Sequence, residues 1–199
     1  METSPIVLIV PLLLVVALVA HELGHAVVAR LYGISVAELG LGLPPRIGAM
    51  RWHGLELSFN LLPLGAFVRY HDHQSEAQSS SPADLPASQR LVIALAGPGA
   101  NFLLAAFALG GAAALSTTLP LQVTGLFFAL AFLSVAIAAT NLIPIPPLDG
   151  SKIILLAVEA ALGRRLVPRR AQARIDRAGL MVMALAFVGC LVFGLVGGL

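Results

Sequence analysis

The sequence is poor in charged residues, in aromatic residues and in cysteine. Only 11% of the 199 residues are charged, compared with about a quarter in soluble domains, and 58% are hydrophobic. This composition leaves little of the chain for a soluble domain and predicts a protein that crosses a membrane several times. The single cysteine, Cys190, excludes an internal disulfide, and its place in an apolar run gives no indication of the redox compartment.

The apolar residues form four runs, each long enough to span a bilayer as a helix, which needs roughly 20 residues. These runs cover residues 5–31, 91–115, 121–143 and 178–199. No Lys or Arg precedes the first run and no cleavage-type break follows it, so we expect it to be retained rather than removed as a signal peptide. The predicted fold is an all-α polytopic membrane protein, organised as a single domain over residues 1–199.

The 12 Lys and Arg residues are confined to two connecting loops and their borders. They lie within or beside residues 33–90 and within residues 151–177, whereas residues 116–120 and both ends of the chain have none. Because basic loops stay in the cytoplasm, both long loops are predicted inside and both termini outside. The second loop's arginines are explained by this topology and by attraction to lipid headgroups. Nucleic-acid binding is a poor alternative, since no aromatic residues accompany them.

The first apolar run contains ionisable side chains where hydrocarbon is expected. Residues 5–20 have no charged or hydrogen-bonding side chain, and His21, Glu22 and His25 follow. A charge at the centre of a membrane helix costs about 2.5–3.5 kcal/mol on insertion scales, so such groups indicate function more than packing. The histidines are four residues apart, share one helix face and can bind the same ion. This is the His-Glu-x-x-His zinc motif, in which the glutamate is the general base.

Asp149 is the best candidate for a third metal ligand. Catalytic zinc usually has three protein ligands and a water, so two histidines leave the site incomplete. Asp149 is the only acid between Asp84 and Glu159, and it follows a proline-rich stretch, residues 144–147, that cannot be regular helix. Alternatively, Asp149 caps the helix predicted to start near Gly150. The spacing does not separate these roles, which are compatible.

The long loop before the second apolar run divides into two parts. Residues 33–70 mix short apolar stretches with turn-forming glycines and prolines, which predicts a small membrane-associated sheet or hairpin. Residues 72–88 are polar and predict a flexible linker. His71 and His73 could chelate an ion, but these histidines and His53 are better explained as solvated surface residues.

The start of the second apolar run indicates close helix packing. Residues 96–100 are Ala, Gly and Pro, and small residues let membrane helices approach closely. Asn101 follows them, and its amide needs a partner in the bundle because an unpaired amide is costly in hydrocarbon.

These motifs together resemble the site-2 protease family of intramembrane zinc metalloproteases. The resemblance rests on His21-Glu22-Leu23-Gly24-His25 and on the stretch from Asn141 to Gly150, Asn-Leu-Ile-Pro-Ile-Pro-Pro-Leu-Asp-Gly. Residues 96–102 are similar to the family's second span, and residues 62–68 to its re-entrant β element, in the branch that includes the bacterial enzyme RseP. Four motifs in the right order cover nearly the whole chain.

The resemblance implies regulated intramembrane proteolysis, in which a transmembrane helix of a single-span protein is cut. It implies one zinc ion held by His21, His25 and Asp149, with Glu22 as general base and acid. Asn141 and the β element would bind the substrate, and the β-element residues in question are Leu57, Ser58, Phe59, Asn60 and Gly65. We expect a multi-pass protein of a bacterial cytoplasmic membrane, with the site in the cytoplasmic half of the first span.

We expect this sequence to differ from the RseP pattern by having no accessory domains. The connection at residues 116–120 is too short for PDZ domains, and no CBS domain is expected, so substrate selection by such domains is not implied. Two other classes stay open, a metal transporter or sensor and an inactive homologue that only binds membrane helices. Glu22 discriminates metal transport from hydrolysis, because transport could spare this carboxylate whereas hydrolysis could not. The intact set of predicted ligands argues against an inactive homologue.

Overall fold

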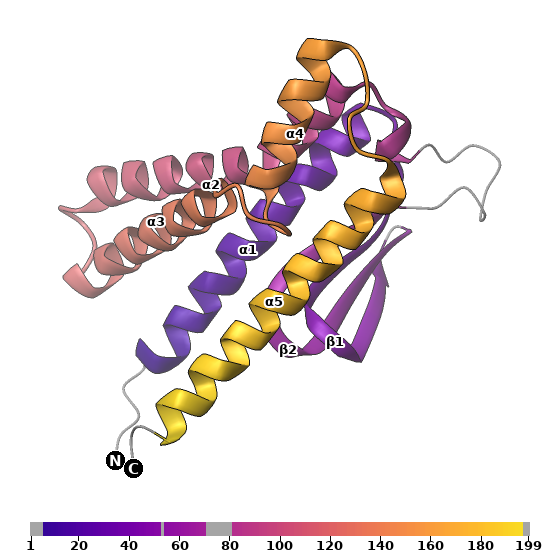
Figure 1. Ribbon diagram of the computed structural model, residues 1–199. Helices are drawn as coiled ribbons and strands as arrows, with labels where there is room; N and C mark the ends of the chain where they lie inside the picture. Colours follow the sequence, from indigo (N-terminus) through magenta and orange to yellow (C-terminus); the bar gives the residue numbers. More distant parts are fainter. Residues whose placement is uncertain (1–5, 53, 71–80, 197–199) are drawn as a thin grey trace.

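The computed structural model describes residues 6–52, 54–70 and 81–196 (Figure 1). Within them, the chain forms in order α1 (Ile6–Leu31), β1 (Val36–Trp52), β2 (Leu55–Tyr70), the short 3-10 helix η1 (Pro82–Asp84), α2 (Ala87–Leu115), α3 (Leu121–Asn141), α4 (Asp149–Leu162) and α5 (Arg169–Val196). His53, His71, His73 and most of the predicted linker lie outside the described residues.

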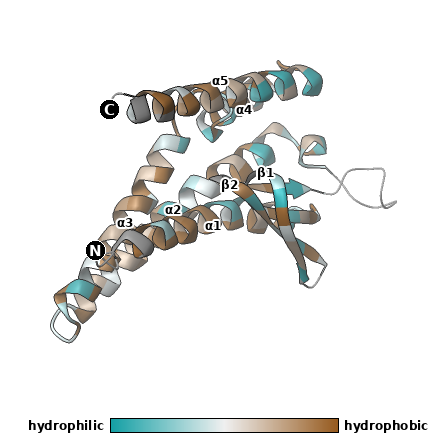
Figure 2. Cartoon of the chain, turned by 90° about the horizontal axis from the view of Figure 1, so that it is seen from below, coloured by the Kyte–Doolittle hydropathy of each residue, from teal (hydrophilic) through white to brown (hydrophobic). Residues whose placement is uncertain are grey.

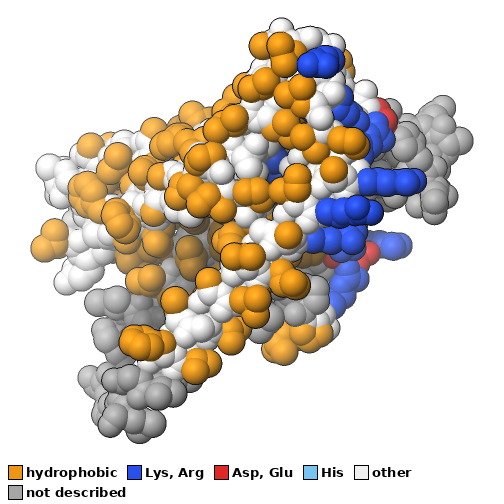
Figure 3. Space-filling model, in the orientation of Figure 1, with side chains coloured by type: hydrophobic (Ala, Val, Ile, Leu, Met, Phe, Trp, Pro, Cys, Tyr) orange, Lys and Arg blue, Asp and Glu red, His pale blue; other side chains and the backbone are white. Residues whose placement is uncertain are grey.

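Four helices of the described chain are long and apolar enough to cross a membrane. They are Ile9–Leu31, Ala87–Leu115, Leu121–Asn141 and Arg169–Gly194. Hydrophobic residues cover most of the length of these helices, and one end of α5 is hydrophilic (Figure 2). The visible Lys and Arg side chains lie mainly along the upper and right-hand side of the molecule (Figure 3). The predicted class, a mostly helical polytopic membrane protein with a sheet between the first two spans, is confirmed.

Two of the four long helices, α2 and α5, begin before the apolar runs that predicted them. α2 begins at Ala87 rather than near Leu91, and α5 begins at Arg169 rather than near Ala178. The early turns of α5 therefore contain arginines of the predicted basic loop. The apolar run marks only the part of a helix that suits hydrocarbon, whereas Arg, Gln and Ala are good helix formers in water and let the helix continue.

Small residues bring α1, α2 and α3 together. A Cβ atom at Gly24 of α1 would lie 2.3 Å from the main-chain oxygen of Ala96 in α2, so only glycine permits this approach. Ala105 and Ala108 of α2 pack against Ala131 of α3 in a second contact. Close main-chain approach is how membrane helices gain packing energy when lipid is as apolar as the side chains.

β1 and β2 are long bent strands whose halves form four paired segments. Residues 36–43 of β1 pair with residues 62–70 of β2 on one side and with residues 55–60 of β2 on the other. Residues 55–60 in turn pair, on their far side, with residues 46–52 of β1. Residues 36–43 and 55–60 are therefore inner segments, and residues 46–52 and 62–70 are outer ones.

A network of ion pairs around one buried acid connects all four segments. Glu38 is 4% exposed, and its Oε2 accepts a hydrogen bond from Arg69 Nη1 at 2.5 Å. Its Oε1 pairs with Arg46, which also binds Glu56 Oε1 at 2.5 Å. Because each residue comes from a different segment, this ion network holds the bent strands in register.

Candidate metal centre

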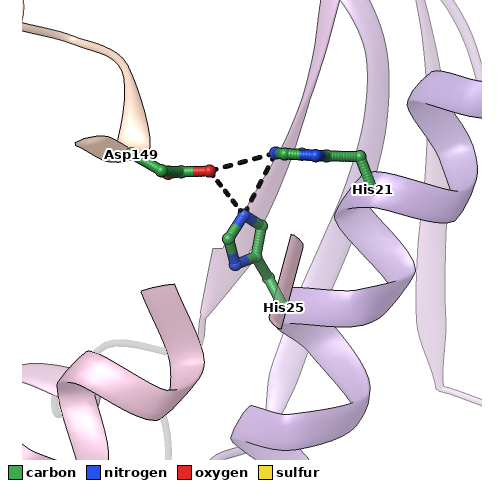
Figure 4. Close-up of side chains that lie close together, drawn as sticks. All are labelled: His21, His25 and Asp149. Atoms are coloured by element: carbon green, nitrogen blue, oxygen red, sulfur yellow. Dashed lines mark hydrogen bonds and ion pairs between the residues drawn. The ribbon is translucent and has the colours of Figure 1, made fainter. Parts of the chain in front are cut away.

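Three side chains converge where α1 passes the beginning of α4 (Figure 4). His21 and His25 lie on one face of α1, and Asp149 is the first residue of α4. Asp149 Oδ2 lies 3.0 Å from Nε2 of each histidine, and the two Nε2 atoms lie 3.3 Å apart. All three side chains are buried, and their potential ligand atoms lie within 4.8 Å of one another. The structure thus brings the three predicted ligands together.

The chain between α3 and α4 turns Asp149 toward the histidines. Residues 142–148 leave the helix, because their prolines cannot donate main-chain hydrogen bonds. Gly150 permits the chain to fold back, since a Cβ atom there would lie 2.3 Å from the Leu142 oxygen. The N-cap residue of α4 is Leu148, and no side chain caps the helix. Asp149 therefore faces the histidines and does not cap α4.

One face of α2 lies against both imidazole rings. The Ile93 main-chain oxygen lies 2.7 Å from His25 Nδ1, and the Asn101 amide lies 3.5 Å from His21 Nδ1. Between them, a Cβ atom at Gly97 would lie 2.2 Å from His25 Nε2 and 2.8 Å from His21 Nε2. Ile93, Gly97 and Asn101 share a face because they are four residues apart. α2 therefore orients the rings while leaving room beside their ligand atoms.

The hydrogen bond of His25 directs an unprotonated nitrogen at Asp149. A carbonyl only accepts, so His25 Nδ1 carries the proton toward Ile93, and the Nε2 of the neutral ring has a lone pair. Asp149 Oδ2 is also an acceptor, so the 3.0 Å between these atoms requires a shared proton or a cation. Neutral imidazole and carboxylate are ordinary zinc ligands, and zinc-bound histidines usually donate their other N–H in this way. The donor set fits zinc.

Asn101 can do the same for His21. Its side chain is fully buried, and its Oδ1 has no hydrogen-bond partner among the described residues. Turning the amide by 180° places this oxygen beside His21 Nδ1, where it accepts the N–H and leaves Nε2 unprotonated. The sequence required a partner for Asn101, and the structure identifies it as His21.

Glu22 lies beside the three buried residues. It is half-buried on α1, and its carboxylate is close enough to interact electrostatically with His21, His25 and Asp149. A general base in this position is able to serve a water at the same site, which keeps Glu22 as the predicted base.

The residues predicted to bind substrate occupy different places. Leu57, Ser58 and Phe59 belong to an inner sheet segment with neighbours on both sides, so their main chain is not an open edge. Gly65 lies in an outer segment. Asn141 is at the end of α3, where its amide donates to the Ile137 oxygen at 3.0 Å. Asn60, the last of the six, donates from its side chain to the Gly42 oxygen at 3.0 Å.

The outer segment at residues 62–70 ends near the centre. Burial raises the pKa of the Tyr70 hydroxyl, and the negative charges of Glu22 and Asp149 raise it further. Sequence reasoning missed Tyr70, the Ile93 carbonyl and the role of Gly97. A main-chain carbonyl has no signature in a sequence, and the small residues beside Gly97 indicated only close packing.

Comparison with known proteins identifies one peptidase family and several proteins described as metalloproteases. The model of peptidase family M50 matches residues 9–119 and 112–186. A protein of Clostridium perfringens described as a candidate zinc metalloprotease is 33% identical over 89 residues, 44% of this chain and 27% of that protein. The chloroplastic membrane metalloprotease ARASP of Arabidopsis thaliana is 32% identical over 112 residues, 53% of this chain and 24% of that protein. In these two alignments, the chain covers about a quarter of each relative's length.

Proposed function

Because the chain belongs to peptidase family M50, we propose that it is a zinc-dependent endopeptidase that cuts transmembrane helices of single-span proteins, as in regulated intramembrane proteolysis. One observation carries this proposal: His21, His25 and Asp149 meet in the interior of a bundle whose long helices are apolar enough to span a membrane. A metal centre at that depth suits a substrate that itself lies in the bilayer.

In the proposed reaction the metal and Glu22 have different roles. His21, His25 and Asp149 would hold one zinc ion, which supplies Lewis acidity and lowers the pKa of water. Glu22 takes a proton from the attacking water and returns it to the leaving amide nitrogen. With these three protein ligands, a further ligand position would be left for water or substrate, as catalytic zinc requires.

An extended substrate is best accommodated along the outer segment at residues 62–70. The peptide bonds of a helix are shielded by their own hydrogen bonds, so the substrate has to unwind before it is cut. Within the described chain, this segment pairs with a strand on one side, so a substrate strand can add on the other. Gly65 lies in it and Tyr70 ends it beside the centre, whereas residues 55–60 support it from within the sheet. Asn141 remains a second proposed contact, from the end of α3.

The arrangement of charge supports a site near the cytoplasmic surface. The beginning of α1 and the end of α5 lie at the same end of the molecule in Figure 1, and the Lys and Arg side chains visible in Figure 3 gather toward the other end. Under the positive-inside bias, the basic end is cytoplasmic. In a bacterial cytoplasmic membrane the termini would then be outside, and water would reach the centre from the cytoplasm.

The proposal is tested with Glu22→Gln in purified protein reconstituted with a single-span model substrate. We expect cleavage to fall by roughly 10²–10⁴-fold, the usual contribution of general acid–base catalysis, while bound zinc stays at one per chain. Asp176→Asn is a control, since this acid lies on α5 and accepts from Gln172 at 3.2 Å, and it should leave both quantities unchanged.

Two outcomes would contradict the proposal. If Glu22→Gln cuts as well as the natural chain, Glu22 is not the base. If both proteins bind zinc and neither cuts a panel of single-span substrates, metal transport or non-catalytic helix binding explains the site better.

A further inference from the structure

α4 begins with the buried acid Asp149 and has a further buried acid, Glu159, near its C-terminal end. Glu159 is 2% exposed, and its Oε2 lies 3.2 Å from Nη1 of Arg90 in the first turn of α2. Its Oε1 accepts main-chain N–H groups of Leu166 at 2.9 Å and Val167 at 3.3 Å. One carboxylate therefore joins α4 to the start of α2 and to the chain that leads to α5.

The partner of Glu159 lies on the face of α2 that orients the histidines. Arg90 precedes Ile93, Gly97 and Asn101 by three, seven and eleven residues, a spacing that keeps all four on one side of a helix. The same face thus holds the rings of α1 at one level and the carboxylate of α4 at another.

α4 transmits this contact to Asp149. The helix runs without a break from Asp149 to Leu162, so Asp149 and Glu159 are about 15 Å apart along one rigid element. α4 packs along α2, and two polar contacts lie near its ends: the direct one at Glu159 and the indirect one through the histidines at Asp149. These two contacts restrict how α4 can slide or rotate about its axis. Metal–ligand distances are held within about 0.2 Å, so a small slide or rotation of α4 would move Asp149 Oδ2 out of range.

Stability alone is a poor explanation for this pair. Removing two charges from water is costly, and well-packed apolar residues often replace a buried ion pair without loss of stability. A buried pair is better suited to selecting one arrangement of two helices over others of similar packing energy.

We propose that the Arg90–Glu159 ion pair is a positioning device for the metal centre, which sets α4 against α2 and thereby holds Asp149 against His21 and His25. This inference rests on the proposed zinc site. Neither residue touches the ligand atoms, so both act through the placement of α4.

The test compares Glu159→Gln, Arg90→Gln and Arg90→Lys in the full chain, using zinc affinity from chelator competition and the absorption spectrum of the cobalt-substituted protein. Glu159→Gln keeps an oxygen for Leu166 and Val167 but removes the charge. We expect both glutamine variants to bind zinc about tenfold more weakly, the scale seen when groups behind the ligands are lost, with an altered cobalt spectrum. Arg90→Lys keeps the charge and should retain most of the affinity.

Asp176→Asn is the matched control. Its carboxylate accepts a hydrogen bond at 3.2 Å from Gln172, which lies on the same helix, α5. We expect natural zinc affinity and an unchanged cobalt spectrum in this variant.

The outcomes separate the inference from the zinc site itself. If His21→Ala leaves zinc affinity unchanged, the proposed site fails and the inference fails with it. If His21→Ala abolishes binding while both glutamine variants keep natural affinity and spectrum, only the positioning role is overturned. A variant that unfolds at lower temperature without zinc but binds zinc normally shows a purely structural pair. If Glu159→Gln does not fold, the zinc affinities of Arg90→Gln and Arg90→Lys still test whether the ion pair positions Asp149.

Discussion

At the scale of single residues, the centre depends on what is missing from α2 as much as on what it contributes. Gly97 has no side chain where the ligand nitrogens of His21 and His25 approach the helix, and a Cβ atom would lie 2.2 Å from the nearer one. The neighbouring Ile93 carbonyl and Asn101 amide fix the other side of each ring. The helix behind the two histidines, α2, thus sets the orientation of these candidate ligands.

We therefore expect Gly97→Ala to weaken zinc binding by about tenfold or more, because the methyl group would displace a ring that has to keep its ligand distance. Gly99→Ala is the control, since a Cβ atom there meets nothing within 4 Å and the helix propensity changes equally. Zinc affinity measured on both variants checks this. Equal affinity for the two would show that the rings have room to move.

At the scale of elements, the sheet depends on charges that are paired inside it. Burial by itself would raise the pKa of the Glu38 carboxyl, but the hydrogen bond from Arg46 and the charges of Arg69 and Arg46 hold this pKa below its usual range. A carboxyl with a lowered folded-state pKa stabilises the fold above its unfolded pKa, about 4.3, and this contribution is lost as the pH falls through the folded-state value.

We expect the hydrogen-exchange protection of β1 and β2 to fall as the pH is lowered below about 4.3. The protection of α1 and α2 should change less, because no carboxylate mediates their contact at Gly24 and Ala96. Glu38→Gln should lose protection already at neutral pH and respond less to acid. Protection factors measured across this pH range for both proteins check the prediction. An acid response that persists unchanged in Glu38→Gln would assign it to another carboxyl.

At the scale of the whole molecule, the arrangement of the four long helices agrees with one orientation in the membrane. The α2–α3 connection contains no basic residue, whereas the connection from α4 to α5 contains Arg164 and Arg165. The positive-inside bias places these two connections on opposite sides.

Thiol labelling tests that orientation, with Cys190 first replaced by alanine. We expect Thr117→Cys to react with a membrane-impermeant reagent on intact cells, because the exposed α2–α3 connection lies outside in the proposed orientation. Arg164→Cys should react only after the membrane is opened. The reverse labelling pattern would show that the protein has the opposite orientation, with the metal centre nearer the outer surface.

Much of this protein follows from local patterns in the sequence. Apolar runs predicted the four long helices, because insertion in lipid depends on composition over about 20 residues. The four-residue spacing of His21 and His25 placed both on one face, because helix geometry is local. The prolines before Asp149 predicted the break that brings it near them.

Other features were decided only by tertiary structure. The sequence did not determine whether Asp149 would cap a helix or face the histidines, because the choice depends on side chains 124 and 128 residues away. Nor did it show that residues 55–60 are an inner segment, that Ile93 offers its carbonyl to His25, or that Glu159 meets Arg90. Each depends on contacts between distant parts of the chain, and main-chain acceptors are the same in every residue. Local patterns predicted the helices and the candidate ligands, whereas long-range packing determined how these side chains are held.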